Sequence, residues 1–350
     1  MSSTADPPAA WGVLFTNLGT PDAPTPRAVR RYLAEFLWDP RVVDAPRLLW
    51  WLALHGVVLR FRPRRSAALY RRVWGDEGSP LLANSRRQAA ALAGELQARI
   101  GQPVPVVLAM RYGNPPIAAG LDALAAAGVE RVLVLPAYPQ YAASTVASTF
   151  DAVARALGRR RRIPELRLVN GYHLHPGYLD ALAERLRGAG IPGPPGRRLL
   201  ISYHGLPQRH VDGGDPYQRQ CLETSAALAA RLGLPPDGWT VSYQSRVGRE
   251  EWLRPYTDEV LAEWGASGVD SVDVVCPGFS ADCLETVDEI SREARDLFLA
   301  SGGRELRYVP ALNDDPAHIR ALAEIVRERT SDWGGWLPAV ATRAPAGVGR

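Results

Sequence analysis

The chain has 350 residues, of which 46% are hydrophobic and 22% are charged. This composition is typical of a folded protein, and the length suffices for two domains of ordinary size. All 41 basic residues are arginine, and 37 acidic residues leave a net charge of only +4. The lack of lysine excludes P-loop and Schiff-base chemistry, and the mild charge gives no indication of a nucleic-acid partner.

The cysteine content and the apolar segments indicate the cellular compartment in which the protein works. Cys221, Cys276 and Cys283 are too few for a disulfide scaffold and cannot supply the four thiolates of an iron–sulfur cluster. The first ten residues lack the features of a signal peptide. The longest apolar stretch, 48–59, is shorter than the roughly 20 residues of a membrane span. We therefore expect a cytoplasmic protein, and we expect it to be a monomer.

Short apolar, β-branched segments alternate with longer helical patterns along the whole chain, which is typical of parallel α/β sheets. The predicted strands lie near 12–16, 104–110, 132–135 and 166–169, and then near 198–202, 240–243, 272–276 and 306–309. The predicted helices include 26–36, 81–100, 176–187, 216–232, 282–300 and 316–329. We predict an α/β fold of two similar doubly wound, Rossmann-like domains, each a four-stranded parallel sheet flanked by helices.

Two pairs of similar segments indicate a duplication. Residues 15–21 and 201–207 share one pattern of apolar, hydroxyl, glycine and proline positions, and 128–134 resembles 268–274 in the same order. Alternatively, glycine and proline simply recur where strands meet loops. We expect an N-terminal domain over 11–170 and a C-terminal domain over 171–310. The helix at 316–329 would pack back on the first domain, and 331–350 would form a loose tail.

Ligands of open parallel sheets bind beyond the carboxyl ends of the strands. His204 directly follows a predicted strand, and Glu285 opens the helix after another. An imidazole and a carboxylate there could share a metal ion or a proton. Glu289 and Glu293 follow Glu285 at intervals of four, which would stack three carboxylates on one helix face as a proton or cation track. Alternatively, His204 is a structural histidine and the glutamates form a solvated face near the positive end of the helix dipole.

Six sequence blocks in order carry a resemblance to a known family. They are Thr-Asn-Leu-Gly-Thr-Pro at 16–21, Tyr-Pro-Gln-Tyr at 138–141, Ser-Tyr-His-Gly-Leu-Pro at 202–207, Gly-Asp-Pro-Tyr at 214–217, Tyr-Gln-Ser-Arg-Val-Gly at 243–248 and Phe-Ser-Ala-Asp-Cys-Leu-Glu-Thr at 279–286. Over 13–326 the chain resembles the ferrochelatases, lyases that insert ferrous iron into a porphyrin at the end of haem synthesis. The resemblance implies Fe(II) and protoporphyrin IX as substrates, with protohaem and two protons as products.

The resemblance also implies roles for individual residues. His204 and Glu285 match the pair assigned to iron, and together with Glu289 they are the expected catalytic residues. Asp282, Glu289 and Glu293 match the acidic line of the family. The expected porphyrin-binding residues are Leu18, Arg72, Ser79, Arg111, Tyr112, Tyr138, Trp252 and Phe279. Leu18 is apolar, as in the protoporphyrin branch, where the coproporphyrin branch has tyrosine.

Two positions depart from the patterns of some relatives. Cys283 stands where some have histidine, and Ala143 stands where cluster-bearing relatives have a cysteine ligand. We therefore expect no iron–sulfur cluster. The arginine-flanked apolar segment 47–65 is interpreted either as a lip beside the cleft that contacts a membrane surface or as a helix buried between the domains.

Two other functions remain open from the sequence. The chain could be a tetrapyrrole or metal carrier without turnover, since two-domain folds of this kind also serve as binding proteins. It could also be a chelatase for another tetrapyrrole or for cobalt. A metalation assay separates these readings from ferrochelatase activity.

Overall fold

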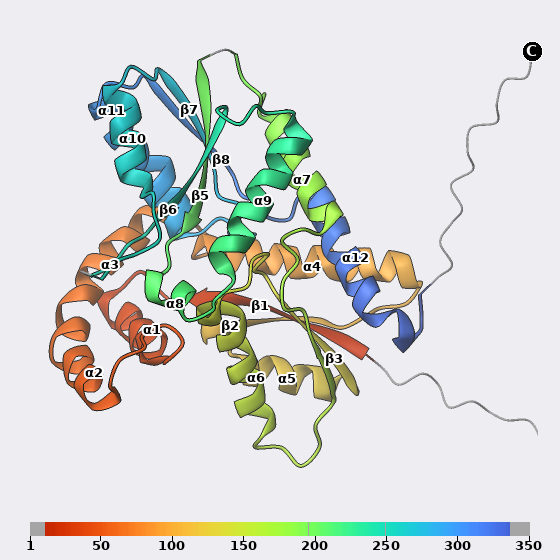
Figure 1. Cartoon of the computed structure of the whole chain (residues 1–350). Helices are drawn as coiled ribbons and strands as arrows, with labels where there is room; N and C mark the ends of the chain where they lie inside the picture. The colour runs from red at the N-terminus through yellow and green to blue at the C-terminus, as the bar shows by residue number, and fades with distance from the viewer. Residues whose placement is uncertain (1–10, 195, 249, 337–350) are drawn as a thin grey trace, which may run out of the picture.

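Two parallel sheets of four strands form the centres of the two halves of the molecule in the computed structural model, which describes residues 11–194, 196–248 and 250–336 (Figure 1). The strand order is β2-β1-β3-β4 in the first sheet and β6-β5-β7-β8 in the second. The strands are β1 (Trp11–Thr20), β2 (Val106–Gly113), β3 (Arg131–Pro136), β4 (Glu165–Leu168), β5 (Arg197–His204), β6 (Trp239–Gln244), β7 (Ser271–Val275) and β8 (Glu305–Val309). The predicted fold of two similar doubly wound halves is confirmed, because the second sheet repeats the strand order of the first.

Helices cover both faces of each sheet (Figure 1). They are α1 (Pro26–Trp38), α2 (Arg47–Ala53), η1 (Leu54–Val58), α3 (Leu59–Val73), α4 (Pro80–Ile100), α5 (Ile117–Ala126), η2 (Ala143–Ala147), α6 (Ser148–Leu157), α7 (Pro176–Gly188), α8 (Gln208–Asp212), α9 (Tyr217–Leu232), α10 (Thr257–Ala266), η3 (Glu285–Ala294), α11 (Arg295–Ala300), α12 (Pro316–Thr330) and η4 (Ser331–Trp333). Thr25 caps α1 by accepting a hydrogen bond from the Ala28 N–H, and Pro26 occupies the first turn, as the sequence predicts.

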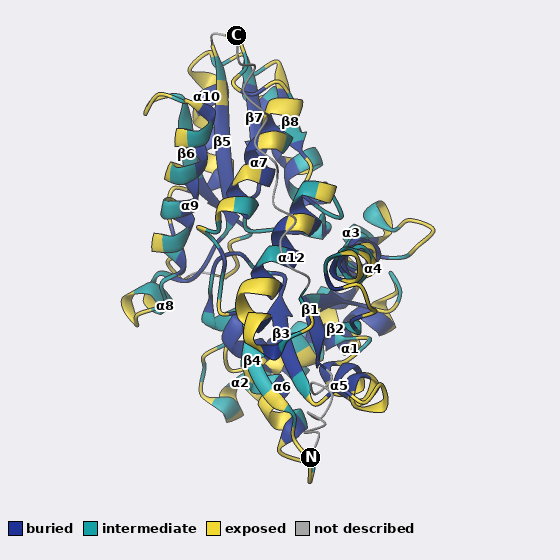
Figure 2. Cartoon of the chain, turned by 90° about the vertical axis from the view of Figure 1, so that its right-hand side faces the viewer, coloured by how far each residue is buried: buried dark blue, intermediate teal, exposed yellow. Residues whose placement is uncertain are grey.

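The largest buried cluster joins the two halves (Figure 2). It includes Phe15 and Leu133 from the first sheet, Ile201 from the second, and Leu322 from α12. Helix α12 contacts α4 and β3 as well as α7. The last helix therefore packs against elements on either side of residue 171.

The segment that follows α12 differs from our expectation of a loose tail. Trp333 is buried, its Nε1–H donates to the Glu165 carboxylate at 3.0 Å, and Arg167 lies over its ring. Trp336 stacks on Trp11 with ring centroids 5.8 Å apart. Residues 331–336 thus pack on the start of β1 because three indole rings bury one another, and 337–350 lie outside the described residues.

The apolar segment 47–65 forms α2, η1 and the start of α3. Leu54 and Leu59 point into the protein, but six large apolar side chains are exposed, namely Leu48, Leu49, Trp51, Leu52, Val57 and Phe61. The alternative of a helix buried between the domains is therefore wrong. No helix within the described residues is long and apolar enough to cross a membrane.

The predicted helix over 282–300 also differs from expectation. Residues Glu285–Ala294 form the π-helix η3, and only Arg295–Ala300 continue as an α-helix. A π-helix bonds each carbonyl to the N–H five residues on, which widens the turn, but side chains four apart still lie near one face of the helix. The contacts of each carboxylate, rather than the helix type, therefore decide which of Glu285, Glu289 and Glu293 can act together.

Candidate active site

His204 ends β5, next to Gln244 at the end of β6. Its Nδ1 lies 2.7 Å from the carbonyl oxygen of Gly205. Because a carbonyl can only accept, Nδ1 carries a proton, and Nε2 is the ring nitrogen left to take a proton or bind a metal ion. The ring centroid lies 6.5 Å from that of Phe279, which follows β7. The imidazole thus stands near the switch point between β5 and β7, where doubly wound sheets bind ligands.

Glu285, the first residue of η3, is tied to the same strand ends. The Gln244 side-chain amide donates to the Glu285 carbonyl oxygen at 3.0 Å. Gln244 itself is buried and accepts a hydrogen bond from Ser202 at 2.8 Å. Because Gln244 lies beside His204 in the sheet, this amide brings the start of η3 to the end of β5.

Glu289 lies one step further along η3. Its Oε1 accepts the backbone N–H of Ser245 at 2.7 Å, and its Oε2 accepts the Ser245 hydroxyl. Burial raises the pKa of Glu289 above its ordinary value; the Ser245 hydroxyl and the charge of His204 oppose this shift, while the charge of Glu285 adds to it. The charges of His204 and Glu285 therefore both act on Glu289. The sequence did not predict Ser245 as a residue of this site.

The other two acidic residues of the predicted track have different surroundings. The Asp282 carboxylate accepts hydrogen bonds from the hydroxyls of Thr286 and Tyr308 and from the Asn313 amide. Glu293 is exposed and lies 3.6 Å from Arg72. The structure thus brings Glu285 and Glu289 together with His204, but it directs Asp282 and Glu293 to other partners.

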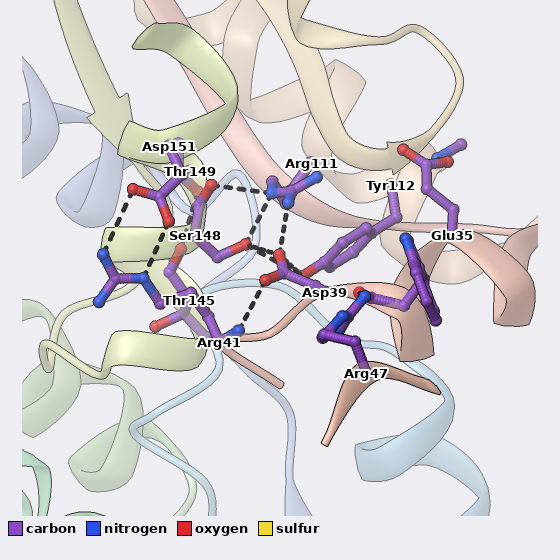
Figure 3. A network of polar contacts seen from close by, with 12 residues as sticks. Glu35, Asp39, Arg41, Arg47, Arg111, Tyr112, Thr145, Ser148, Thr149 and Asp151 are labelled. Carbon is purple, nitrogen blue, oxygen red and sulfur yellow. Dashed lines mark hydrogen bonds and ion pairs between the residues drawn. The ribbon is translucent and has the colours of Figure 1, made fainter. Parts of the chain in front are cut away.

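Arg111 and Tyr112 belong to a buried network at the carboxyl end of β2 (Figure 3). Arg111 forms an ion pair with Asp39 and donates to Ser148. The Tyr112 hydroxyl donates to Asp39 at 2.7 Å, and the Ser148 hydroxyl does so at 2.6 Å. Burial raises the pKa of Asp39, but the hydrogen bonds from Ser148 and Tyr112, aided by the charge of Arg111, outweigh it, so this pKa lies below its ordinary value. Asp39 and Ser148 were missed because they lie 72 and 37 positions from Arg111.

The remaining predicted residues of the first half lie in β1, in α3, at the start of α4 and after β3. Leu18 packs against the cluster that contains Tyr112, and so does Leu284, the neighbour of Glu285. Ser79 is buried and caps α4. The Tyr138 hydroxyl is buried without a hydrogen-bond partner. Arg72 lies 3.7 Å from the buried Asp288 as well as close to Glu293. Ser79 and Arg72 are thus already engaged within the chain.

Trp252 lies beside the His204 turn. Its Nε1–H donates to the Val247 carbonyl at 2.9 Å. A Cβ on Gly205 would stand 2.8 Å from the Gln244 carbonyl oxygen and 3.1 Å from the Trp252 ring. Glycine therefore lets the tryptophan approach the strand end that carries His204.

Within the described residues, no three His, Cys, Asp or Glu side chains are grouped closely enough to hold a metal ion. His204 and Glu285 are therefore proposed as metal ligands rather than observed as a preformed centre.

Residues 10–330 match the family model described as Ferrochelatase. The chain belongs to the ferrochelatase family. It is 56% identical over 326 residues to the ferrochelatase of Thioalkalivibrio sulfidiphilus, spanning 93% of this chain and 88% of that relative. It is 53% identical over 328 residues to the ferrochelatase of Nitrosococcus oceani, spanning 94% and 89%. The family resemblance inferred from the six blocks is thus confirmed.

Two solved structures share the fold of this chain. SirB from Bacillus subtilis with Fe3+ superposes with a TM-score of 0.55 at 15% identity, covering 94% of this chain and 100% of SirB. CbiX, the terminal enzyme of sirohaem biosynthesis in denitrifying bacteria, gives 0.50 at 16% identity, covering 91% and 98%. At such low identity these two likenesses show the fold alone.

Proposed function

We propose that this chain inserts ferrous iron into protoporphyrin IX, releasing two protons and giving protohaem. Family membership supports the reaction class. The observation that carries the proposal for the site is that hydrogen bonds from Gln244 and Ser245, at the end of β6 beside His204, tie the part of η3 that carries Glu285 and Glu289 to this strand end. Iron is a substrate here, not a resident cofactor.

Insertion must remove two pyrrole protons and strip water from the cation. Nε2 of His204 takes a pyrrole proton or binds the entering iron, because its lone pair is free when Nδ1–H is held by Gly205. Glu285 with Glu289 moves the positive charge in or out. Burial raises the pKa of Glu289, which brings it closer to the working pH of a proton carrier. Imidazole and carboxylate ligands accept Fe(II) and also Zn(II).

The porphyrin lies against side chains of both halves. Tyr138, Trp252 and Phe279 offer aromatic surface, and Leu18 offers the apolar contact that favours protoporphyrin over coproporphyrin. The Tyr112 ring is fully buried and lies behind this surface. Holding the ring non-planar, at a strain of about 1–5 kcal/mol, would expose its nitrogen lone pairs. Arg111 lines the cleft beside Tyr112, while Arg72 and Ser79 lie close to the propionates of the porphyrin. Arg72 exchanges its partners Asp288 and Glu293 for a propionate when the ring binds.

The chain works without an iron–sulfur cluster. Cys221, Cys276 and Cys283 are each buried and free, and Ala143 donates its backbone N–H to Asp215 at 2.7 Å. Four thiolates are needed to hold such a cluster. Iron content and absorption of the anaerobically purified protein test this point, and cluster absorption would contradict it.

The exposed segment 47–65 contacts a membrane surface, so that a cytoplasmic monomer takes up its apolar porphyrin there. Arg47, Arg60 and Arg64 flank the exposed leucines and tryptophan. Flotation with anionic liposomes tests the contact. Leu48→Glu with Trp51→Glu removes the protein from the liposome fraction, whereas Ile163→Glu, which replaces an exposed apolar residue elsewhere, does not. Unchanged flotation of the double variant contradicts the contact.

An anaerobic assay with Fe(II) on protoporphyrin IX and coproporphyrin side by side tests the reaction. His204→Ala and Glu285→Gln each lower turnover by on the order of 10²–10⁴-fold, with unchanged circular dichroism and melting. The surface variant His173→Ala is the matched control. Porphyrin binding without turnover in the wild type would instead favour a carrier, and ordinary activity in either variant removes that residue from its role.

A further inference from the structure

Two non-glycine residues of the described chain have a left-handed backbone, Ser245 with φ of 66° and Asn313 with φ of 48°. Ser245 directly follows β6, and Asn313 follows β8. A side chain at this φ is unfavourable, and glycine would adopt the conformation without strain. Strain of this kind persists where the surroundings enforce it, commonly at functional sites. Both residues bind a carboxylate, Glu289 on η3 for Ser245 and Asp282 just before η3 for Asn313.

Ser245 binds Glu289 through two donors. The left-handed turn presents both its backbone N–H and its hydroxyl to the two oxygens of the carboxylate. Glycine could supply only the N–H. These two bonds aim the Glu289 carboxylate from η3 towards the strand ends, where His204 and Glu285 act on it electrostatically.

Asn313 also binds its carboxylate, Asp282, through two hydrogen bonds, but Asp282 has further hydrogen-bond partners. Its side-chain amide donates to Asp282 at 2.8 Å, and its amide oxygen accepts the Asp282 N–H at 2.8 Å. The Asp282 carboxylate also receives the hydroxyls of Thr286 and Tyr308. Loss of Asn313 would therefore leave Asp282 in place, whereas Glu289 depends on Ser245 for every hydrogen bond that the structure gives its carboxylate.

We propose that Ser245 is a positioning residue for metal insertion, which holds the Glu289 carboxylate in the orientation that serves His204. The inference rests on the proposed role of Glu289. It assigns the strain at Ser245 to the reaction and the left-handed turn at Asn313, a residue type that tolerates this φ, to folding. A hydroxyl at Ser245 keeps one oxygen of Glu289 fixed while the other receives the backbone N–H.

The test is anaerobic iron insertion by the full chain carrying Ser245→Gly, which removes the hydroxyl and relieves the strained backbone. We expect kcat to fall by about 10- to 100-fold, the range for losing one hydrogen bond to a charged group. KM for porphyrin stays within about twofold, because Ser245 is not one of the residues proposed to bind the ring. Ser245→Ala lowers kcat equally, and it melts at a lower temperature than Ser245→Gly because it keeps the strained backbone that glycine relieves.

A double-mutant cycle separates positioning from a purely structural role. In a Glu289→Gln background, Ser245→Gly should lower kcat by no more than about twofold, because the group that it positions is already lost. Asn313→Gly is the matched control, and it lowers the melting temperature with kcat unchanged. A normal kcat in Ser245→Gly beside an impaired Glu289→Gln overturns this inference alone. Normal kcat in Glu289→Gln overturns the proposed role of Glu289 as well.

Discussion

At the carboxyl end of the first sheet, the buried carboxylate of Asp39 receives Arg111, Tyr112 and Ser148, and its pKa lies below the ordinary value. At the matching end of the second sheet, Glu289 has Ser245 as its hydrogen-bond partner, and burial raises its pKa. The strand orders are equivalent. In the first half, this topology carries a carboxylate whose charge is neutralised by Arg111, and the network stabilises the fold. In the second half, it carries Glu289, whose raised pKa suits proton or metal transfer. The predictions below test that contrast.

The largest effect on stability is expected at Asp39. Removing it leaves the Arg111 guanidinium buried without its counter-charge, which costs about 3–5 kcal/mol. Urea unfolding of Asp39→Ala measures this loss. Asp151→Ala, which breaks the more exposed pair with Arg41, is the control and should change the unfolding free energy by less than about 1 kcal/mol. Equal losses of unfolding free energy in the two variants would show that the buried ion pair stabilises the protein no more than the exposed one.

His318 makes the seam between the halves sensitive to acid. Burial lowers its pKa from 6.5 to about 4, and its Nδ1 lies 2.7 Å from the Asn313 carbonyl, which also accepts a bond from Gln88 of α4. The unfolded chain binds a proton at higher pH than the folded one, so stability is complete above pH 6.5 and falls as the pH drops towards 4. The total loss is about 3 kcal/mol.

Unfolding free energies at pH 7 and pH 4.5 measure this dependence. His318→Gln should remove the His318 contribution and flatten the difference between the two values. His55→Gln, in the exposed segment 47–65 and beside Trp51 rather than a carboxylate, should keep the slope of the wild type. An unchanged slope in His318→Gln would exclude His318 as its source.

Ser148→Ala should have an intermediate effect. It removes one donor to Asp39 but leaves Arg111 and Tyr112 in place, so the expected cost is about 1.5–3 kcal/mol. Iron insertion by the folded variant should match the wild type, in contrast to Ser245→Gly. A loss of turnover at full stability would mean that the first network also serves the reaction.

The smallest effect is expected where the halves meet at the surface. Arg209 of α8 lies 3.0 Å from Asp44, and both side chains are largely exposed. Asp44→Asn should cost no more than about 1 kcal/mol, and salt should reduce even that. Unfolding at low and high ionic strength measures it. A larger loss would show that the halves depend on this ion pair.

Much of the fold was predictable because it depends on local patterns. All eight strands lie where short apolar runs predicted them, and the strand-end positions of His204 and Glu285 followed from those runs. The π-helix was not predictable, because Glu285–Ala294 has the amphipathic pattern of an ordinary helix. The packing of Trp333 and Trp336 was also missed, because their partners Glu165 and Trp11 lie 168 and 325 positions away in the sequence.

The amino-acid order by itself determined the alternation of strand and helix and the residue types at each strand end, since periodicity and chain direction are local properties. Only the tertiary structure decided which charges meet. Asp39 contacts Arg111, which lies 72 positions away in the sequence, and Ser245 contacts Glu289, which lies 44 positions away. Burial and hydrogen bonding then set the protonation of these carboxylates, because both depend on neighbours that folding alone brings together.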